Sequence, residues 1–162
     1  MKKLSLWGLA VVAAVGLCAG GAAQAKDGEQ IVFTPETIQW GPGPASLPAG
    51  AQMAVLDGDP TKPGPFTLRL KFPANYKVSP HWHPADEHVT VIAGTLHLAL
   101  GDKVGAPQEE KVLPAGSFRV MPAKAHHFGW TAEEGTILQL HGMGPWEINY
   151  LDSSDDPRIS KK

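Results

Sequence analysis

The sequence predicts an all-β fold, an antiparallel barrel or sandwich of eight or nine short strands. In residues 66–72, the apolar side chains of Phe66, Leu68, Leu70 and Phe72 alternate with polar ones, as a half-buried antiparallel strand requires. The 162 residues include 15 prolines and 18 glycines, which mark frequent turns. No stretch shows the 3.6-residue periodicity of an amphipathic helix. Strand patterning alone leaves both the barrel and the sandwich open.

The remaining strands are expected where short apolar or β-branched runs lie between turn residues. These runs are 31–33, 52–56, 88–93, 95–100, 118–121, 127–131, 136–141 and 146–151. Residues 93–94 and 132–135 are expected to form hairpin turns, and 31–33 an edge strand. Four alternating glycines and prolines at 41–44 predict that residues 40–48 form an irregular arm across the surface.

The N-terminus has the features of a secretory signal peptide. Lys2 and Lys3 precede an almost wholly apolar or small stretch at 4–21, and Ala-Gln-Ala at 23–25 is typical of a cleavage site. A membrane anchor and a lipid anchor on Cys18 are the alternatives, and Leu17 before that cysteine disfavours the second. We expect residues 1–25 to be removed, which places the protein in the periplasm or outside the cell with no membrane span.

Cleavage would leave 162 − 25 = 137 residues, enough for one domain at 26–162. We expect an N-terminal arm at about 26–50, a barrel at about 51–151 and a polar tail at 152–162. The formal net charge is −2, and removing two lysines from 14 basic residues leaves 12 against 16 acidic ones, or −4. This mildly acidic chain is not expected to bind nucleic acid, which favours a basic face.

Three potential metal ligands lie within seven positions, at His81, His83 and Glu87. Ser79 and His83 each precede a proline, which favours an extended backbone, and side chains two apart in an extended chain leave the same face. A bend at 84–86 can return Glu87 towards the two imidazoles. Two neutral imidazoles and a carboxylate suit one divalent ion of iron, manganese, nickel, copper or zinc.

The spacing His81-x-His83, three residues, Glu87, six residues, Gly94 resembles the first motif of the cupin family. Gly116, five residues, Pro122 and then His127 resembles the second. The resemblance implies an antiparallel cupin barrel, also called a double-stranded β-helix or jelly roll. It also implies that His127 is the fourth metal ligand. This sequence departs from the motifs where Asn75, Lys124 and Thr131 stand, and none of these is a ligand position.

The sequence gives less reason to place the other histidines at the metal site. His126 is the alternative to His127, because adjacent strand residues face opposite ways and the motif spacing selects only the second. His88 is expected to pack on the outer face, and His97 to be an exposed strand residue. Five further residues are candidates for lining the pocket, either because they flank the ligands in sequence or because they would lie on a nearby strand: Trp82, Phe128, Trp130, Gln139 and His141.

The resemblance implies a metal-binding protein that acts on a small organic molecule, and two functions follow. The first is a mononuclear-metal oxygenase or other oxidoreductase. The second is a non-catalytic, metal-dependent sensor or binding module. No residue beyond the ligands is assigned to catalysis. Cupin-like barrels frequently pair through sheet edges, and residues 31–33 could add to a neighbour's sheet as an edge strand, so we also expect a homodimer.

Overall fold

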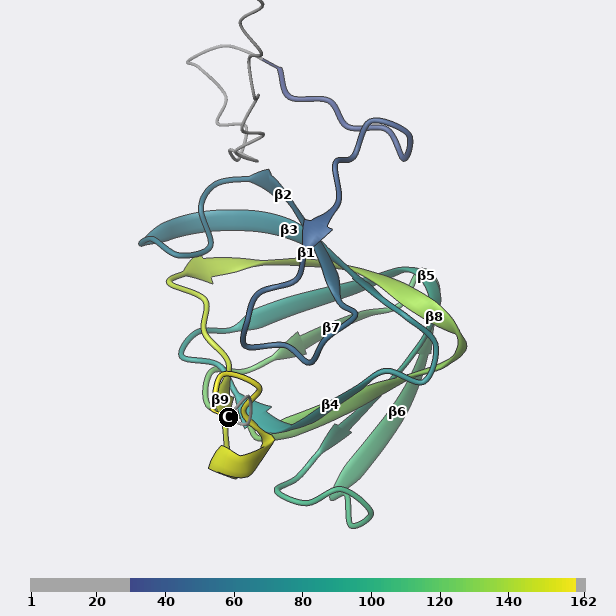
Figure 1. Ribbon diagram of the computed structural model, residues 1–162, viewed down its shortest axis with the longest axis vertical. Helices are drawn as coiled ribbons and strands as arrows, with labels where there is room; N and C mark the ends of the chain where they lie inside the picture. Colours follow the sequence, from purple (N-terminus) through teal and green to yellow (C-terminus); the bar gives the residue numbers. More distant parts are fainter. Residues whose placement is uncertain (1–29, 160–162) are drawn as a thin grey trace, which may run out of the picture.

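A computed structural model describes residues 30–159, so the expected signal peptide and Cys18 lie outside the described residues. Within this range the protein is almost entirely β (Figure 1). The elements are β1 (Gly41–Pro42), β2 (Gln52–Asp57), β3 (Gly64–Phe72), β4 (Lys77–Trp82), β5 (Glu87–Leu100), β6 (Glu109–Pro114), β7 (Phe118–Met121), β8 (His127–Gly144), β9 (Asn149–Tyr150) and a 3-10 helix, η1 (Ser153–Asp155). All the strand pairs are antiparallel.

Two long strands, β5 and β8, connect the two layers of the fold. They pair with each other along most of their length, and each has different outer neighbours in its two halves. Residues 136–144 of β8 pair with β3, and residues 87–90 of β5 pair with β7. The other halves, 127–130 of β8 and 95–100 of β5, pair with β4 and β6. The sheet therefore folds over on itself into the predicted jelly roll, with β1 to β3 on one side and β4, β6 and β9 on the other (Figure 1).

The fold-over point depends on two glycines that lie against each other. Gly94 and Gly135 have φ values of 74° and 71°, in the left-handed region that favours glycine. A Cβ on Gly94 would approach the carbonyl oxygen of Gly135 to 2.1 Å. Register shifts between Val91 and Ala93, and between Gly94 and Leu96, bend β5 at the same place.

The inner faces of the two layers form one apolar core. Alternate residues of β3, β5 and β8 point inwards, which confirms the strand pattern read at 66–72. Leu68 and Val91 are almost completely buried, and Val78 and Leu98 close the core from the second layer. This interior is where the pocket lies.

Several predicted boundaries are wrong. Residues 31–33 form no strand, and residues 41–42, expected in the irregular arm, pair with β2. The predicted turns at 93–94 and 132–135 lie inside continuous strands, because β5 and β8 bend there and keep pairing. Sequence patterning missed β4 and β6, and of the predicted strand 146–151 only β9 is formed.

The three departures from the family motifs are accommodated locally. Asn75 and Lys124 adopt φ values of 56° and 63°, a conformation that glycine would reach more easily. The Lys124 amide donates to the carbonyl of His83 at 2.8 Å, so this turn holds the backbone beside the predicted ligands. The Thr131 hydroxyl donates to Pro73 and accepts from the Tyr76 amide.

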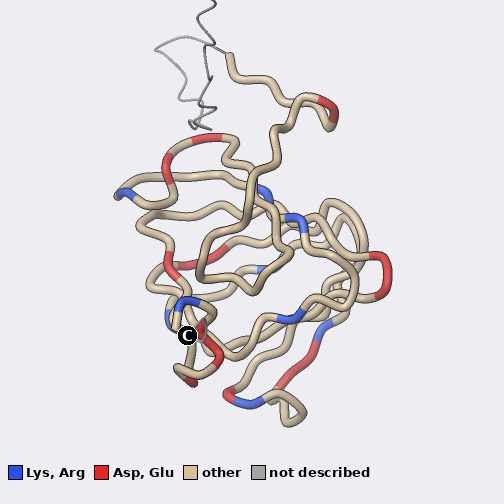
Figure 2. Tube along the Cα trace, viewed as in Figure 1, with Lys and Arg blue, Asp and Glu red and all other residues tan. Residues whose placement is uncertain are grey.

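Charged residues of both signs are interspersed along the described chain (Figure 2). Among residues 30–159, no helix reaches the length and hydropathy that crossing a membrane requires.

Candidate metal centre

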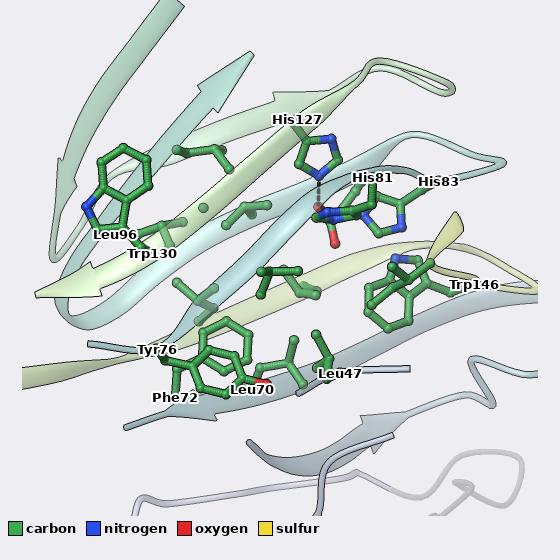
Figure 3. Close-up of a pocket in the computed structure, with 18 residues that line it drawn as sticks. Leu47, Leu70, Phe72, Tyr76, His81, His83, Leu96, His127, Trp130 and Trp146 are labelled. Atoms are coloured by element: carbon green, nitrogen blue, oxygen red, sulfur yellow. Dashed lines mark ion pairs between the residues drawn. The ribbon is translucent and has the colours of Figure 1, made fainter. Parts of the chain in front are cut away.

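Three histidines from two separate segments converge at one end of the barrel. His81 lies in β4, His83 immediately follows that strand, and His127 is the first residue of β8, where it pairs with His81. Each is at least 94% buried, with exposures of 6%, 2% and 2%. One nitrogen from each ring lies within 4.8 Å of the corresponding atom of the other two. The rings point towards one another in Figure 3.

Backbone carbonyls fix the tautomer of all three rings. The Nδ1 atoms of His81 and His83 lie 2.7 Å from the carbonyl oxygens of Ser79 and Glu147, and that of His127 lies 2.9 Å from the oxygen of Ala125. A carbonyl can only accept, so Nδ1 carries the proton in each ring, leaving a lone pair on Nε2. Metal-bound histidines are held in this way, with one nitrogen on a carbonyl and the other on the ion.

Glu87 completes the set from the first position of β5. Its side chain is buried, and Oε2 lies 3.5 Å from Nε2 of His83 and 3.9 Å from Nε2 of His127 (Figure 3). The structure thus brings the four predicted ligands to one place. Nε2 of His83 is buried with no hydrogen-bond partner among the described residues, and a cation would satisfy its lone pair. The donor set fits one transition-metal ion.

Burial sets the protonation states of these groups. It lowers the pKa of His83 to about 4, and it lowers the pKa of His81 well below its ordinary value. The pKa of His127 is also lowered by burial, although the Glu87 carboxylate opposes the change. Burial raises the pKa of Glu87, and His127 and Trp146 partly offset this. The imidazoles are therefore neutral at neutral pH, as metal binding requires.

We expect the metal-free protein to lose stability as the pH falls from about 7 to about 5. Histidines in the unfolded chain take up protons near their ordinary pKa of about 6.5, whereas the buried rings resist protonation, so acid favours the unfolded state. For His83, whose folded pKa is about 4, the free energy of unfolding falls by about 3 kcal/mol as the pH drops from the unfolded pKa to the folded one. Glu87, whose pKa is raised, contributes with the opposite sign and offsets part of the loss. Urea denaturation of metal-free protein at the two pH values measures the effect, and equal stability would contradict it.

A narrow apolar cavity of about 60 Å³ lies beside the four residues. Trp146 flanks the ligand end, and Trp130 and Leu96 lie towards the other end (Figure 3). A cavity of this size can hold a few water molecules. Its walls, apart from the four ligand candidates, are Leu47, Leu70, Phe72, Tyr76, Val78, Val89, Leu96, Leu98, Gly129, Trp130, Leu138, Leu140, Trp146 and Ile148.

Of the five predicted pocket residues, only Trp130 lines this cavity. Gln139 and His141 require correction, because Leu138 and Leu140 take the inward positions of β8 and leave the alternate residues on the outer face. Gln139 accepts a hydrogen bond from Arg69 at 3.1 Å, and His141 packs against His88.

Trp82 and Phe128 also do not line the cavity. Trp82 lies between the two inward histidines of its segment and so takes the opposite face. Phe128 is buried beneath a separate outer groove that Trp130 shares. A strand residue next to a ligand faces away from it, so sequence adjacency to a ligand predicts a position outside the pocket.

The alternative between His126 and His127 is decided by burial. His126 is exposed, and its Nδ1 lies 2.8 Å from Oδ1 of Asp102 on the outer surface, whereas His127 is buried and faces Glu87. His88 packs on the outer face, as expected. His97 is half-buried, and its ring stacks on Trp130 at a centroid distance of 5.0 Å.

Sequence reasoning missed residues that only folding brings to the site. Trp146 stacks on the His83 ring, with centroids 5.2 Å apart and planes 18° apart. Leu47 reaches the cavity from the arm, and Ile148 reaches it from the loop before β9. No metal motif marks these positions. A tryptophan in a predicted strand was the only available signal.

Several solved structures share this fold. They include the polyketide cyclase RemF from Streptomyces resistomycificus, with 14% identity, a TM-score of 0.63, and coverage of 80% of this chain and 91% of that one. A proposed acetylacetone dioxygenase from Methylibium petroleiphilum has 18% identity, a TM-score of 0.58, and coverage of 80% and 85%. An RmlC-like cupin from Ralstonia eutropha has 22% identity, a TM-score of 0.58, and coverage of 77% and 74%. These likenesses establish the fold alone.

Fold and motifs together define the class as a protein with a cupin-like barrel. The chain belongs to the family described as "Domain of unknown function (DUF4437)", which matches residues 30–156. No curated protein matches the chain.

Proposed function

We propose that this protein binds one divalent transition metal through His81, His83, His127 and Glu87, and that it acts on a small organic molecule as an oxygenase or other oxidoreductase. The observation that carries the proposal is the convergence of three buried imidazoles whose Nδ1 atoms are all engaged by carbonyls. Structural neighbours include a polyketide cyclase and a proposed dioxygenase, so the fold is compatible with enzymatic roles.

The metal would supply Lewis acidity and, if it is iron, manganese or copper, redox chemistry. The chain itself supplies four candidate ligands and an apolar pocket beside them. Leucine, valine and aromatic side chains line this pocket, and its volume of about 60 Å³ favours a small molecule or one end of a larger one.

One observation favours the alternative, a non-catalytic metal-dependent binding module. Apart from the four ligand candidates, the ionisable side chain in the described cavity lining is Tyr76, whose hydroxyl donates to the carbonyl of Pro48 at 2.5 Å. Burial raises the pKa of Tyr76, which disfavours its use as a base. The lining therefore offers no uncommitted group for acid–base catalysis.

Metal analysis of protein purified from its native compartment tests the proposal. Stoichiometric iron, manganese or copper, with oxygen consumption on adding small organic acids or ketones, supports an oxygenase. Zinc with tight ligand binding and no turnover supports the binding module. Protein that stays metal-free after reconstitution with iron, manganese, nickel, copper and zinc contradicts both.

We also propose export and a homodimer. Export rests on the features of residues 1–25, and an N-terminus at Lys26 in purified mature protein would agree with it.

The dimer rests on β7, which is paired only with β5 among the described strands and carries exposed Phe118 and Val120. Light scattering at micromolar concentration is expected to give twice the monomer mass, and a monomer would reject it.

A further inference from the structure

Two buried polar atoms beside the metal centre lack partners among the described residues. One is Nε2 of His83, which accepts, and the other is Nε1 of Trp146, which donates. Their rings stack at 5.2 Å, so both atoms belong to one end of the cavity. A buried polar atom without a partner is unfavourable by about 1–3 kcal/mol, which makes this pair informative about what binds there.

The two atoms require opposite partners. The His83 lone pair requires a cation, and the indole N–H of Trp146 requires an acceptor. One metal-bound ligand with an oxygen atom next to the ion would satisfy both requirements. Glu87 is an acceptor on the same side of the cavity, and Trp146 lowers its pKa, but the indole N–H makes no hydrogen bond of normal geometry with it.

The Trp146 ring is held firmly enough to define the direction of its N–H. Its backbone amide donates to the carbonyl of Pro60 at 2.7 Å, and its ring packs against Phe66 with centroids 6.4 Å apart. The His83 ring, itself fixed by the carbonyl of Glu147, stacks on one face of the indole. Such a preorganised donor suits recognition better than a mobile one.

Charge and size identify the class of ligand. Three neutral imidazoles, one carboxylate and a divalent ion would carry a net charge of +1, which a monovalent anion neutralises. The remaining walls are apolar and the cavity is about 60 Å³, so the body of the anion must be short and hydrophobic. We propose that the site takes a short-chain monocarboxylate, and that the indole N–H of Trp146 holds one of its oxygens. This inference rests on the metal site proposed above.

Zinc-loaded, uniformly ¹⁵N-labelled protein tests this directly, because zinc is diamagnetic and the tryptophan indole signals can be followed by NMR. Acetate is the probe. Acetamide tests the need for a negative charge, and hexanoate tests the limit on chain length. We expect acetate to shift the Trp146 signal, acetamide and hexanoate to leave it in place, and Trp146→Phe to weaken acetate binding about 10-fold. Phenylalanine keeps a ring against His83 and removes only the N–H donor. Trp40→Phe is the matched control and should bind acetate normally, because Trp40 packs against Lys71 and does not line the cavity.

The outcomes separate the two proposals. Failure of the native protein to bind zinc overturns the metal site itself. Normal zinc binding with unchanged acetate affinity in Trp146→Phe overturns the role of the indole. A Trp146 signal that moves on zinc loading but not on acetate addition assigns the N–H to Glu87, and this also overturns the proposal.

Discussion

Replacing His83 with alanine is expected to abolish stoichiometric binding of a divalent transition metal. The substitution removes one of three converging imidazoles and leaves the Trp146 ring without its stacking partner. Loss of an outer-shell partner typically lowers metal affinity about 10- to 100-fold, so loss of a direct ligand should exceed about 100-fold. Titration of metal-free protein with zinc, followed by calorimetry, measures the change.

The chain contains matched controls for this experiment. His88→Ala and His126→Ala remove histidines that point away from the cavity, so both variants should bind metal like the native protein. His127→Ala should behave like His83→Ala. Full metal binding by His83→Ala, with its fold confirmed by circular dichroism, would refute the assignment of the metal centre.

Replacing Gly94 with alanine is expected to destabilise the fold by more than about 3 kcal/mol. A side chain in the left-handed conformation is itself unfavourable by about 1–2 kcal/mol. In addition, the new Cβ would lie 2.1 Å from the Gly135 carbonyl oxygen. That oxygen belongs to the backbone of β8, which pairs with β5 on both sides of the contact, so it cannot easily move away. Urea denaturation measures the loss.

Gly116→Ala separates the clash from the conformational effect. Gly116 has a φ of 87°, but a Cβ there would have no heavy atom within 4 Å among those compared. The free energy of unfolding of this variant should therefore fall by only about 1–2 kcal/mol. If the two alanine variants were equally stable, the close approach of the two glycines would not be what fixes the fold-over of β5 and β8.

The outer-face residues show why part of the sequence interpretation failed. Gln139 and His141 were assigned to the pocket because a polar pair in an apolar strand required partners. The register of β8 instead puts Leu138 and Leu140 inside. Side-chain alternation in a strand determines which residues share a face, but it does not say which face is buried.

The predicted hairpins failed for a related reason. Glycine at 94 and 135 correctly marked places where the backbone takes an unusual conformation. Local sequence cannot distinguish a turn that ends a strand from a bend within a strand that continues to pair. The pairing of β5 with β8 across both glycines is a long-range interaction, and it converted two expected turns into one fold-over.

The sequence by itself determined the all-β class, the alternation at 66–72 and three candidate ligands, because these depend on residue type and short spacing, and the family resemblance added His127. Only the tertiary structure decided that Nε2 of each histidine faces the centre, because that depends on carbonyls such as that of Glu147, 64 residues from His83. It also placed Trp146 over His83 and reduced the pocket to about 60 Å³. The chemistry of the ligands is local, whereas the shape and polarity of the space around them come from segments that meet only when the chain folds.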